Sequence, residues 1–330
     1  MKIGLVDVDN LGKFPNLPLM KISAYHKAKG DSVEFANVFD HYDRIYSSKV
    51  FNREYFKEAF YVYNTDEMVF GGTGYAISVK NGIEVYNKGK DWDLPYEMEH
   101  MYPDYSLYPS LTKGKAFGFL TRGCPNCCPF CIVSKKEGVE SKKVADLIEW
   151  WDGQKEIVLM DANILACKDR EDLLMQLAKS NASVDYTQGL DARHITKDVA
   201  ELLKQIKTKT FHFAFDLMKN EQAILNGLKI VREVINPDPR RSIVYILTNY
   251  NTTFEEDIYR IRKVQELGFR PDVRVYRKGT EPKITKWMAR WSNNRFVYNS
   301  APDFMDYMPR KDGKTMKQIL EEGIDENHQS

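Results

Sequence analysis

The chain has 330 residues, of which 43% are hydrophobic and 29% are charged, and its formal net charge is +1. The length accommodates two domains, and the near-zero charge excludes a global attraction to nucleic acid or to an anionic membrane. No run of about 18 apolar residues is present, and the first acidic residue, Asp7, comes too early for a secretory signal. These features predict a cytoplasmic protein without a membrane partner.

The first 110 residues alternate short apolar strands with helices, which predicts an α/β fold with a doubly wound parallel sheet. Strands are expected at 3–8, 32–38, 43–47 and 67–70, a turn at 9–12, and helices at 17–29 and 52–60. Gly30 is expected to close the first helix. Residues 80–110 are rich in Tyr, Pro and Asp and are expected to form an irregular linker.

The second domain, expected at 111–300, repeats a strand-then-helix pattern six times, which predicts a partial (β/α)6 TIM-like barrel. Its expected strands cover 116–121, 157–160, 184–187, 211–215, 243–247 and 273–276, and its expected helices cover 143–151, 170–179, 197–207, 221–236, 254–267 and 282–291. Thr196 and Thr253 are expected N-caps, and Gly268 is expected to close the fifth helix. A C-terminal tail is expected at 301–330, and its charged part, 310–330, is expected to fray.

Four of the five cysteines crowd into residues 124–131, directly after the first strand of the expected barrel. This odd, clustered set is no disulfide framework and indicates metal binding. Cys124, Cys128 and Cys131 form a C-x3-C-x2-C pattern, and thiolates are the ligands of iron–sulfur clusters. Three thiolates on one loop can bind three irons of a cubane, which leaves the fourth iron open to an external ligand. Gly123 allows the backbone to turn sharply before the loop.

This spacing after the first barrel strand, with the aromatic Phe130 before the last cysteine, resembles the radical S-adenosylmethionine (SAM) superfamily. The resemblance implies a single [4Fe–4S] cluster on Cys124, Cys128 and Cys131, whose open iron binds the amino and carboxylate groups of SAM. In that family an electron from the cluster cleaves SAM to methionine and a 5′-deoxyadenosyl radical, which abstracts hydrogen from substrate. It therefore implies an oxygen-sensitive enzyme with a one-electron reductant such as flavodoxin or ferredoxin. Its substrate, a small molecule or a nucleotide-type compound, stays unidentified.

Polar residues at the ends of the other expected strands are candidates for the same site. The resemblance implies SAM contacts for Phe130, whose backbone would face adenine, for Asp161 or Asn163, which stand in place of a Gly-Gly-Glu element, and for Gln188, Asp191 and Arg193. Because a guanidinium binds a carboxylate bidentately, Arg193 is expected on the methionine carboxylate, with pairing to its neighbouring carboxylate as the alternative. Asp216 and Asn249 are candidate catalytic residues, with internal hydrogen bonding as the alternative.

Cys127 leaves room for a zinc site with four cysteine ligands, because Cys124-x2-Cys127 and Cys128-x2-Cys131 form two pairs. Four ligands within eight residues crowd a tetrahedral site, so Cys127 and Cys167 are expected to be bystanders. The corresponding alternative function is a non-enzymatic iron–sulfur or zinc module for electron transfer or binding.

The N-terminal part resembles the cobalamin-binding, Rossmann-like domain that precedes many radical SAM barrels. The Asp-x-His-x-x-Gly element of that domain reads Asp7-Val8-Asp9-Asn10-Leu11-Gly12 here, and Ser48-Lys49-Val50 and Gly71-Gly72 stand at the later elements. A cobalamin-dependent radical SAM methyltransferase is therefore an alternative. Asp9 replaces the histidine that would ligate cobalt, which argues against bound cobalamin and for a domain that closes the barrel or shapes substrate access.

Residues 270–295 carry eight Lys and Arg side chains, and Trp287 and Trp291 share a helix face. Basic groups interleaved with aromatic rings can bind phosphates and stack bases, which keeps nucleic acid open as a partner. The favoured interpretation is a final helix that packs its tryptophans on the barrel and exposes its charges.

Overall fold

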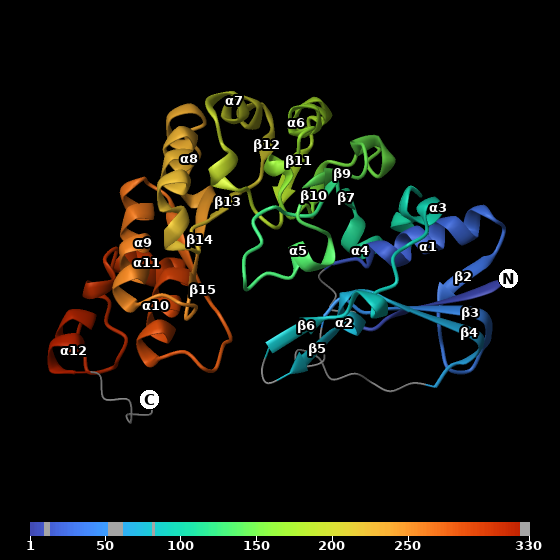
Figure 1. Ribbon diagram of the computed structural model, residues 1–330, viewed down its shortest axis with the longest axis horizontal. Coiled ribbons are helices and arrows are strands. Elements are labelled where there is room, and N and C mark those ends of the chain that lie inside the picture. Colours follow the sequence, from blue (N-terminus) through green and yellow to red (C-terminus); the bar gives the residue numbers. More distant parts are fainter. Residues whose placement is uncertain (10–13, 52–61, 81–82, 324–330) are drawn as a thin grey trace. The chain divides into compact units, whose positions relative to one another are not determined.

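The computed structural model describes residues 1–9, 14–51, 62–80 and 83–323. The helix expected at 52–60, and residues 10–12 of the expected turn, lie outside the described residues. The chain is a mixed α/β structure with parallel sheets, and it divides into two compact units, Met1–Thr187 and Gln188–Ser330 (Figure 1). No helix in the described ranges is long and apolar enough to cross a membrane.

The first unit opens with a four-stranded sheet in the order β2-β1-β3-β4, with every pair parallel. Its strands are β1 (Lys2–Asp7), β2 (Ser32–Phe35), β3 (His41–Ser48) and β4 (Asn64–Gly71). Helix α1 (Leu17–Ala28) packs against it (Figure 1), and Ile3, Leu5 and Leu19 lie in the shared core. The side chain of Asn16 accepts from the Leu19 N–H and caps the helix. The four strands and the first helix expected here are confirmed.

The segment expected as an irregular linker contains regular structure, so that expectation is wrong in part. Strands β5 (Ile77–Lys80) and β6 (Ile83–Tyr86) pair antiparallel, and the short helices α2 (Thr73–Ala76), α3 (Tyr96–Glu99) and α4 (Pro109–Thr112) flank them.

Two tyrosines connect elements on the two sides of residue 110. The hydroxyl of Tyr108 donates to Asp7 at the end of β1 at 2.7 Å, and the hydroxyl of Tyr105 donates to the Trp150 carbonyl at 2.5 Å. Burial raises the pKa of both phenols. The segment therefore packs on elements from both sides of the expected boundary.

The rest of the first unit holds a second parallel set in the order β11-β10-β7, formed by β7 (Lys115–Gly118), β10 (Glu156–Leu159) and β11 (Ser183–Tyr186). Strand β8 (Thr121–Arg122) pairs antiparallel with β9 (Lys142–Lys143), and helices α5 (Val133–Lys136) and α6 (Arg170–Ser180) complete the unit. The prediction of a helix at 143–151 is wrong, because the structure has only the 3-10 turn Leu147–Glu149 there. Asp146 and Glu149 form a capping box on a single 3-10 turn, and Gln176 of α6 donates to Asp146 at 2.6 Å.

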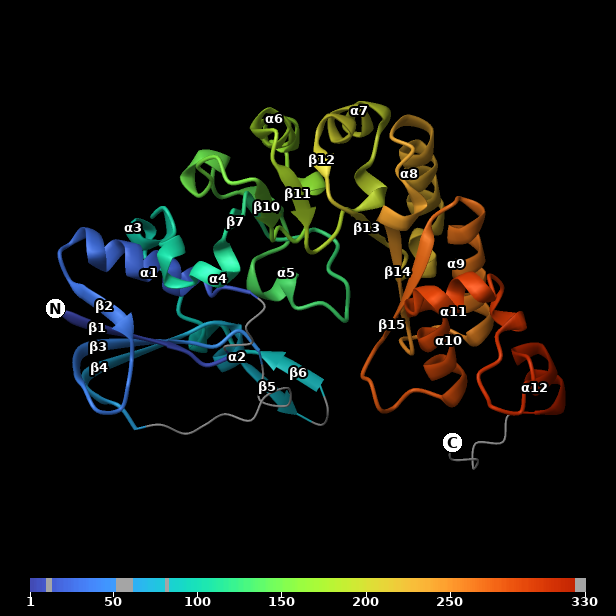
Figure 2. The ribbon, with the colours of Figure 1, turned by 180° about the vertical axis from the view of Figure 1, so that it is seen from behind.

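The second unit contains a parallel sheet in the order β13-β14-β15, with helices along it (Figure 2). Its elements are α7 (Lys197–Gln205), β12 (Lys207–Thr208), β13 (Phe211–Ala214), α8 (Glu221–Val234), β14 (Ser242–Thr248), α9 (Phe254–Glu266), β15 (Arg270–Val275), α10 (Lys283–Asn293), α11 (Arg295–Ser300) and α12 (Met316–Glu322). The expected caps are confirmed, since Thr196 accepts from the Val199 N–H and Thr253 forms a capping box with Glu256.

The two tryptophans of α10 are buried, as the favoured interpretation expected. The indole nitrogen of Trp291 donates to the Ala301 carbonyl at 2.6 Å, so neither ring is presented for base stacking. The expectation that the tail frays is wrong up to Glu322, because Met316 and Ile319 of α12 are fully buried in the second unit.

Candidate functional site

A glycine turns the chain from β8 into the cysteine loop. Gly123 has a φ of +89°, and a Cβ there would lie 2.1 Å from the Glu140 carbonyl oxygen. Both the left-handed backbone and the close approach require glycine. Glycine at this position therefore allows the chain after β8 to place Cys124 next to residues 137–140.

Alanine at this position is expected to disturb the loop. Gly123→Ala adds about 1–3 kcal/mol of backbone strain to the clash with Glu140, so we expect lower stability and less iron bound after reconstitution. Urea unfolding and iron analysis measure both. Gly153→Ala is the control, because Gly153 has a φ of +79° but open space around its Cβ position. Equal losses in the two variants would contradict the role of the close approach.

One carboxylate closes the base of the loop. Glu137 accepts from Arg122 Nη1 at 3.0 Å through one oxygen and from the Gly123 N–H at 3.1 Å through the other. The Cys124 N–H donates to the Gly138 carbonyl at 3.1 Å. The three residues that enter the loop are thus held by the two residues that leave α5.

The five cysteines form no disulfide, and those of the C-x3-C-x2-C pattern are partly exposed. Around a single zinc ion, Zn–S bonds of about 2.3 Å place tetrahedral sulfurs roughly 3.8 Å apart. Within the described ranges, which include every cysteine, no three cysteine sulfurs lie within 4.8 Å of one another. The irons of a cubane take one thiolate each and so hold sulfurs farther apart than one ion does. As placed, no three of these sulfurs lie close enough together to bind one zinc ion, and Cys127 is exposed.

Asp161, which follows β10, holds the strand end that leads to the loop. It is 4% exposed, and it accepts from the N–H groups of Leu120 and Thr121, each at 2.8 Å, and from the Thr121 hydroxyl at 2.6 Å. Burial raises its pKa to about 7, against the lowering effect of these donors. The carboxylate is thus turned toward protein donors and positions the chain three residues before Cys124.

The polar group predicted after β11 forms a local ion pair. Arg193 donates from Nε and Nη2 to the two carboxylate oxygens of Asp191, at 2.7 and 2.9 Å. The alternative left open by the sequence, pairing with the neighbouring carboxylate, is the arrangement observed. Gln188 precedes this turn, and Gly189 has a φ of +83°. Because Asp191 already accepts from Nε and Nη2 of Arg193, a carboxylate ligand would have to share the guanidinium with Asp191.

Asp216, which follows β13, lies near Arg193 in the second unit. Its carboxylate accepts from the Leu247 N–H at 3.1 Å, and burial raises its pKa to about 6 although Arg260 and Arg193 lower it. Asn249, which follows β14, has a φ of +61° and donates to the Tyr276 carbonyl at 2.8 Å and to the Thr280 hydroxyl at 3.2 Å. The structure therefore groups Asp191, Arg193 and Asp216, and it gives Asn249 the internal hydrogen bonds of the alternative.

A buried arginine that the sequence analysis missed organises these strand ends. Arg260 of α9 is fully buried and donates to the carbonyls of Phe215 at 2.7 Å, Asp216 at 3.0 Å and Leu247 at 2.8 Å. It also forms an ion pair with Asp257, one turn earlier on the helix. The i,i+3 spacing of Asp257 and Arg260 on the apolar face of the expected helix was the available signal.

A cavity of about 420 Å³ lies in the first unit at the carboxyl ends of β3 and β4. Ser48, Gly71 and Trp92 line it, together with Arg122 and Glu137 from the base of the cysteine loop. The cavity is thus lined both by the N-terminal sheet and by residues at the base of the cysteine loop.

The residues at the cobalt-ligand position do not fit bound cobalamin. Asp9 stands where the ligating histidine would be, and its carboxylate accepts from the backbone N–H groups of Val50 and Phe51. It offers no imidazole nitrogen to a cobalt ion.

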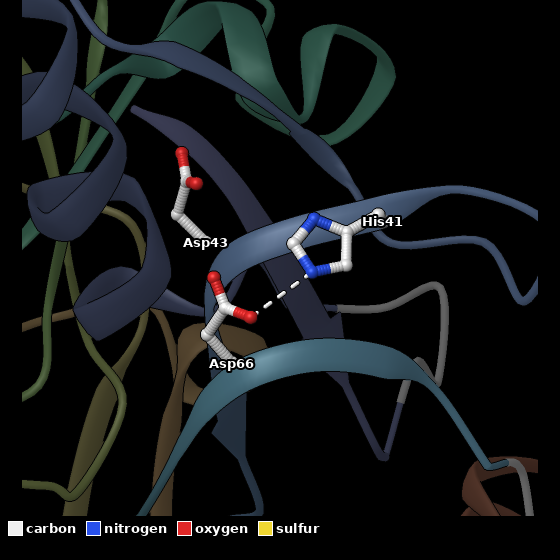
Figure 3. Close-up of side chains that lie close together, drawn as sticks. All are labelled: His41, Asp43 and Asp66. Atoms are coloured by element: carbon white, nitrogen blue, oxygen red, sulfur yellow. Dashed lines mark hydrogen bonds and ion pairs between the residues drawn. The ribbon is translucent and has the colours of Figure 1, made fainter.

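Three metal-ligand side chains gather at the opposite end of β3 and β4 (Figure 3). His41, Asp43 and Asp66 place one ligand atom each within 4.8 Å of the others. His41 and Asp66 have side chains 50% and 67% exposed and already pair at 3.1 Å, and Asp43 accepts from the Lys2 N–H. Such an exposed, self-paired group carries no metal assignment.

No family model and no curated protein that we compared with the sequence matches it. The features that point to a function are the cysteine loop, with its C-x3-C-x2-C spacing, and the groups that hold it.

Proposed function

We propose that this protein is a radical SAM enzyme whose [4Fe–4S] cluster is held by Cys124, Cys128 and Cys131. The observation that carries the proposal is a C-x3-C-x2-C loop that begins two residues after β8, whose three cysteines are partly exposed and form no disulfide. When bound, the cluster supplies the electron that cleaves SAM, and the resulting 5′-deoxyadenosyl radical abstracts hydrogen from substrate.

The residues of this chain hold and shield that chemistry. Asp161 and Glu137 fix the entry to the loop, and the three thiolates bind iron. Three protein ligands for a four-iron cluster leave one position for the cosubstrate. Thiolates of this kind persist in a reducing compartment, which supports a cytoplasmic location.

A partial (β/α)6 barrel belongs to the proposal. It is supported by six parallel strands in two sets, β7, β10, β11 and β13, β14, β15, each followed along the chain by a helix. In such barrels binding groups collect at the carboxyl ends of the strands. On this basis Phe130, Gln188, Asp191 and Arg193 are proposed to contact SAM, and Asp216 is proposed to face substrate.

Anaerobic reconstitution with iron, sulfide and a reductant such as flavodoxin or dithionite tests the proposal. The expected product absorbs at about 400 nm, contains about four irons per chain and forms 5′-deoxyadenosine when SAM is added. Production of S-adenosylhomocysteine with bound corrinoid would instead indicate the cobalamin-dependent methyltransferase. A colourless protein with one zinc per chain would falsify the enzymatic function and favour the binding module.

The raised pKa of Asp216 predicts a measurable dependence of stability on pH. Its pKa rises from 3.8 to about 6 on folding. Between about pH 4 and pH 6 the folded state therefore keeps a proton that the unfolded state has lost, so the free energy of unfolding falls as pH rises. We expect a loss on the order of 2 kcal/mol across this window, after a discount for partial exposure. Urea titrations of the wild type and Asp216→Asn should differ in this slope, and parallel profiles would refute the assignment.

A further inference from the structure

A buried amide contacts the first cysteine of the loop. Asn163 follows β10, is 3% exposed and directs its side-chain nitrogen at Cys124 Sγ, 3.6 Å away. Its side-chain oxygen accepts from the Ala166 N–H at 3.3 Å and caps the short turn Ile164–Ala166. Because that oxygen faces a backbone donor, the group facing the sulfur is the N–H donor.

The donor is held in place from its backbone. The buried Ser141 hydroxyl donates to the Asn163 carbonyl at 2.7 Å. Two residues earlier, Asp161 fixes Leu120 and Thr121, which lead to the loop. The donor and the sulfur are thus positioned by the same end of β10, so their contact does not depend on a mobile side chain.

We infer that Asn163 is a positioning residue that tunes the cluster by donating an N–H···S hydrogen bond to the Cys124 thiolate. This inference rests on the proposed function. Reduction adds negative charge that spreads onto the cysteine sulfurs, and a donor to sulfur stabilises that charge. The hydrogen bond therefore raises the reduction potential of the cluster and eases the arrival of the electron that the reaction requires.

The variant Asn163→Ser separates this effect from the fold. Serine keeps a side-chain oxygen that can cap the turn, carries no charge, and is too short to reach the sulfur. We expect a reconstituted cluster with wild-type iron content and a more negative midpoint potential in a redox titration followed by electron paramagnetic resonance. Asn294→Ser is the matched control, because Asn294 also caps a helix through its side-chain oxygen, and it should leave the potential unchanged.

A measurement on the wild type keeps the inference testable if Asn163→Ser fails to fold. Protein carrying ¹⁵N in its asparagine side chains should show a weak ¹⁵N coupling in the hyperfine spectrum of the reduced cluster, and Asn163→Asp should lack it. Equal midpoint potentials in Asn163→Ser and the wild type, or no ¹⁵N coupling, would overturn the inference while leaving the enzyme intact. Absence of any cubane in the wild type would instead refute the proposed function.

Discussion

Serine in place of Cys124, Cys128 or Cys131 is expected to remove both the cluster and SAM cleavage. Each thiolate supplies one of three iron ligands, and a serine hydroxyl does not replace a thiolate on iron. The loss of 5′-deoxyadenosine formation should exceed the roughly 100-fold loss that is typical of an outer-sphere partner. Iron analysis, absorbance at about 400 nm and product quantification after anaerobic reconstitution measure the three effects.

Cys127→Ser and Cys167→Ser are the matched controls for this series. Cys127 is exposed in the same loop, and Cys167 is buried beyond β10. Both variants should keep the iron content and the SAM cleavage of the wild type. If Cys127→Ser lost the metal as completely as Cys124→Ser, the four-cysteine zinc site would become the better explanation.

Replacing Arg260 with methionine is expected to cost about 3–5 kcal/mol of unfolding free energy, the range for breaking a buried ion pair. Arg260 is fully buried, and its removal leaves the Asp257 carboxylate unpaired and the carbonyls of Phe215 and Leu247 without this donor. Burial already raises the pKa of Asp257. The strand ends that carry Asp216 should loosen as a result.

Urea unfolding compares this variant with Arg262→Met. Arg262 lies on the same helix but pairs with Asp303 on the surface, with both side chains nearly half exposed, so its loss should cost less than about 1 kcal/mol. The double variant Arg260→Met, Asp257→Leu should recover part of the stability, because no unpaired charge stays buried. Similar losses for Arg260→Met and Arg262→Met would contradict the structural role of the buried pair.

Most elements that the sequence predicted correctly are specified by nearby residues. Thr253 and Glu256 close a capping box three residues apart, and the apolar run of β14 marks its own strand. The helix expected at 143–151 failed for the opposite reason. Gln176, thirty residues along the chain, donates to Asp146, which caps only a single 3-10 turn in the structure.

The candidate site divides in the same way. The cysteine pattern is local, so its spacing alone suggested a cluster. Asn163 reaches Cys124 across 39 residues and Arg260 reaches Phe215 across 45, so their roles depend on tertiary contacts that no local pattern encodes. The position of Asp161 after a strand was predicted from the sequence. The N–H groups of Leu120 and Thr121 that donate to it could be identified only in the structure.

An iron that no cysteine binds is the feature on which SAM cleavage depends. ⁵⁷Fe Mössbauer spectroscopy of the reconstituted protein, recorded with and without SAM, observes that iron directly. We expect the isomer shift of a single iron site to change when SAM is added while the cysteine-bound sites stay as they were. A cubane whose irons are all indifferent to SAM, or the absence of a cubane, would contradict the function proposed for this chain.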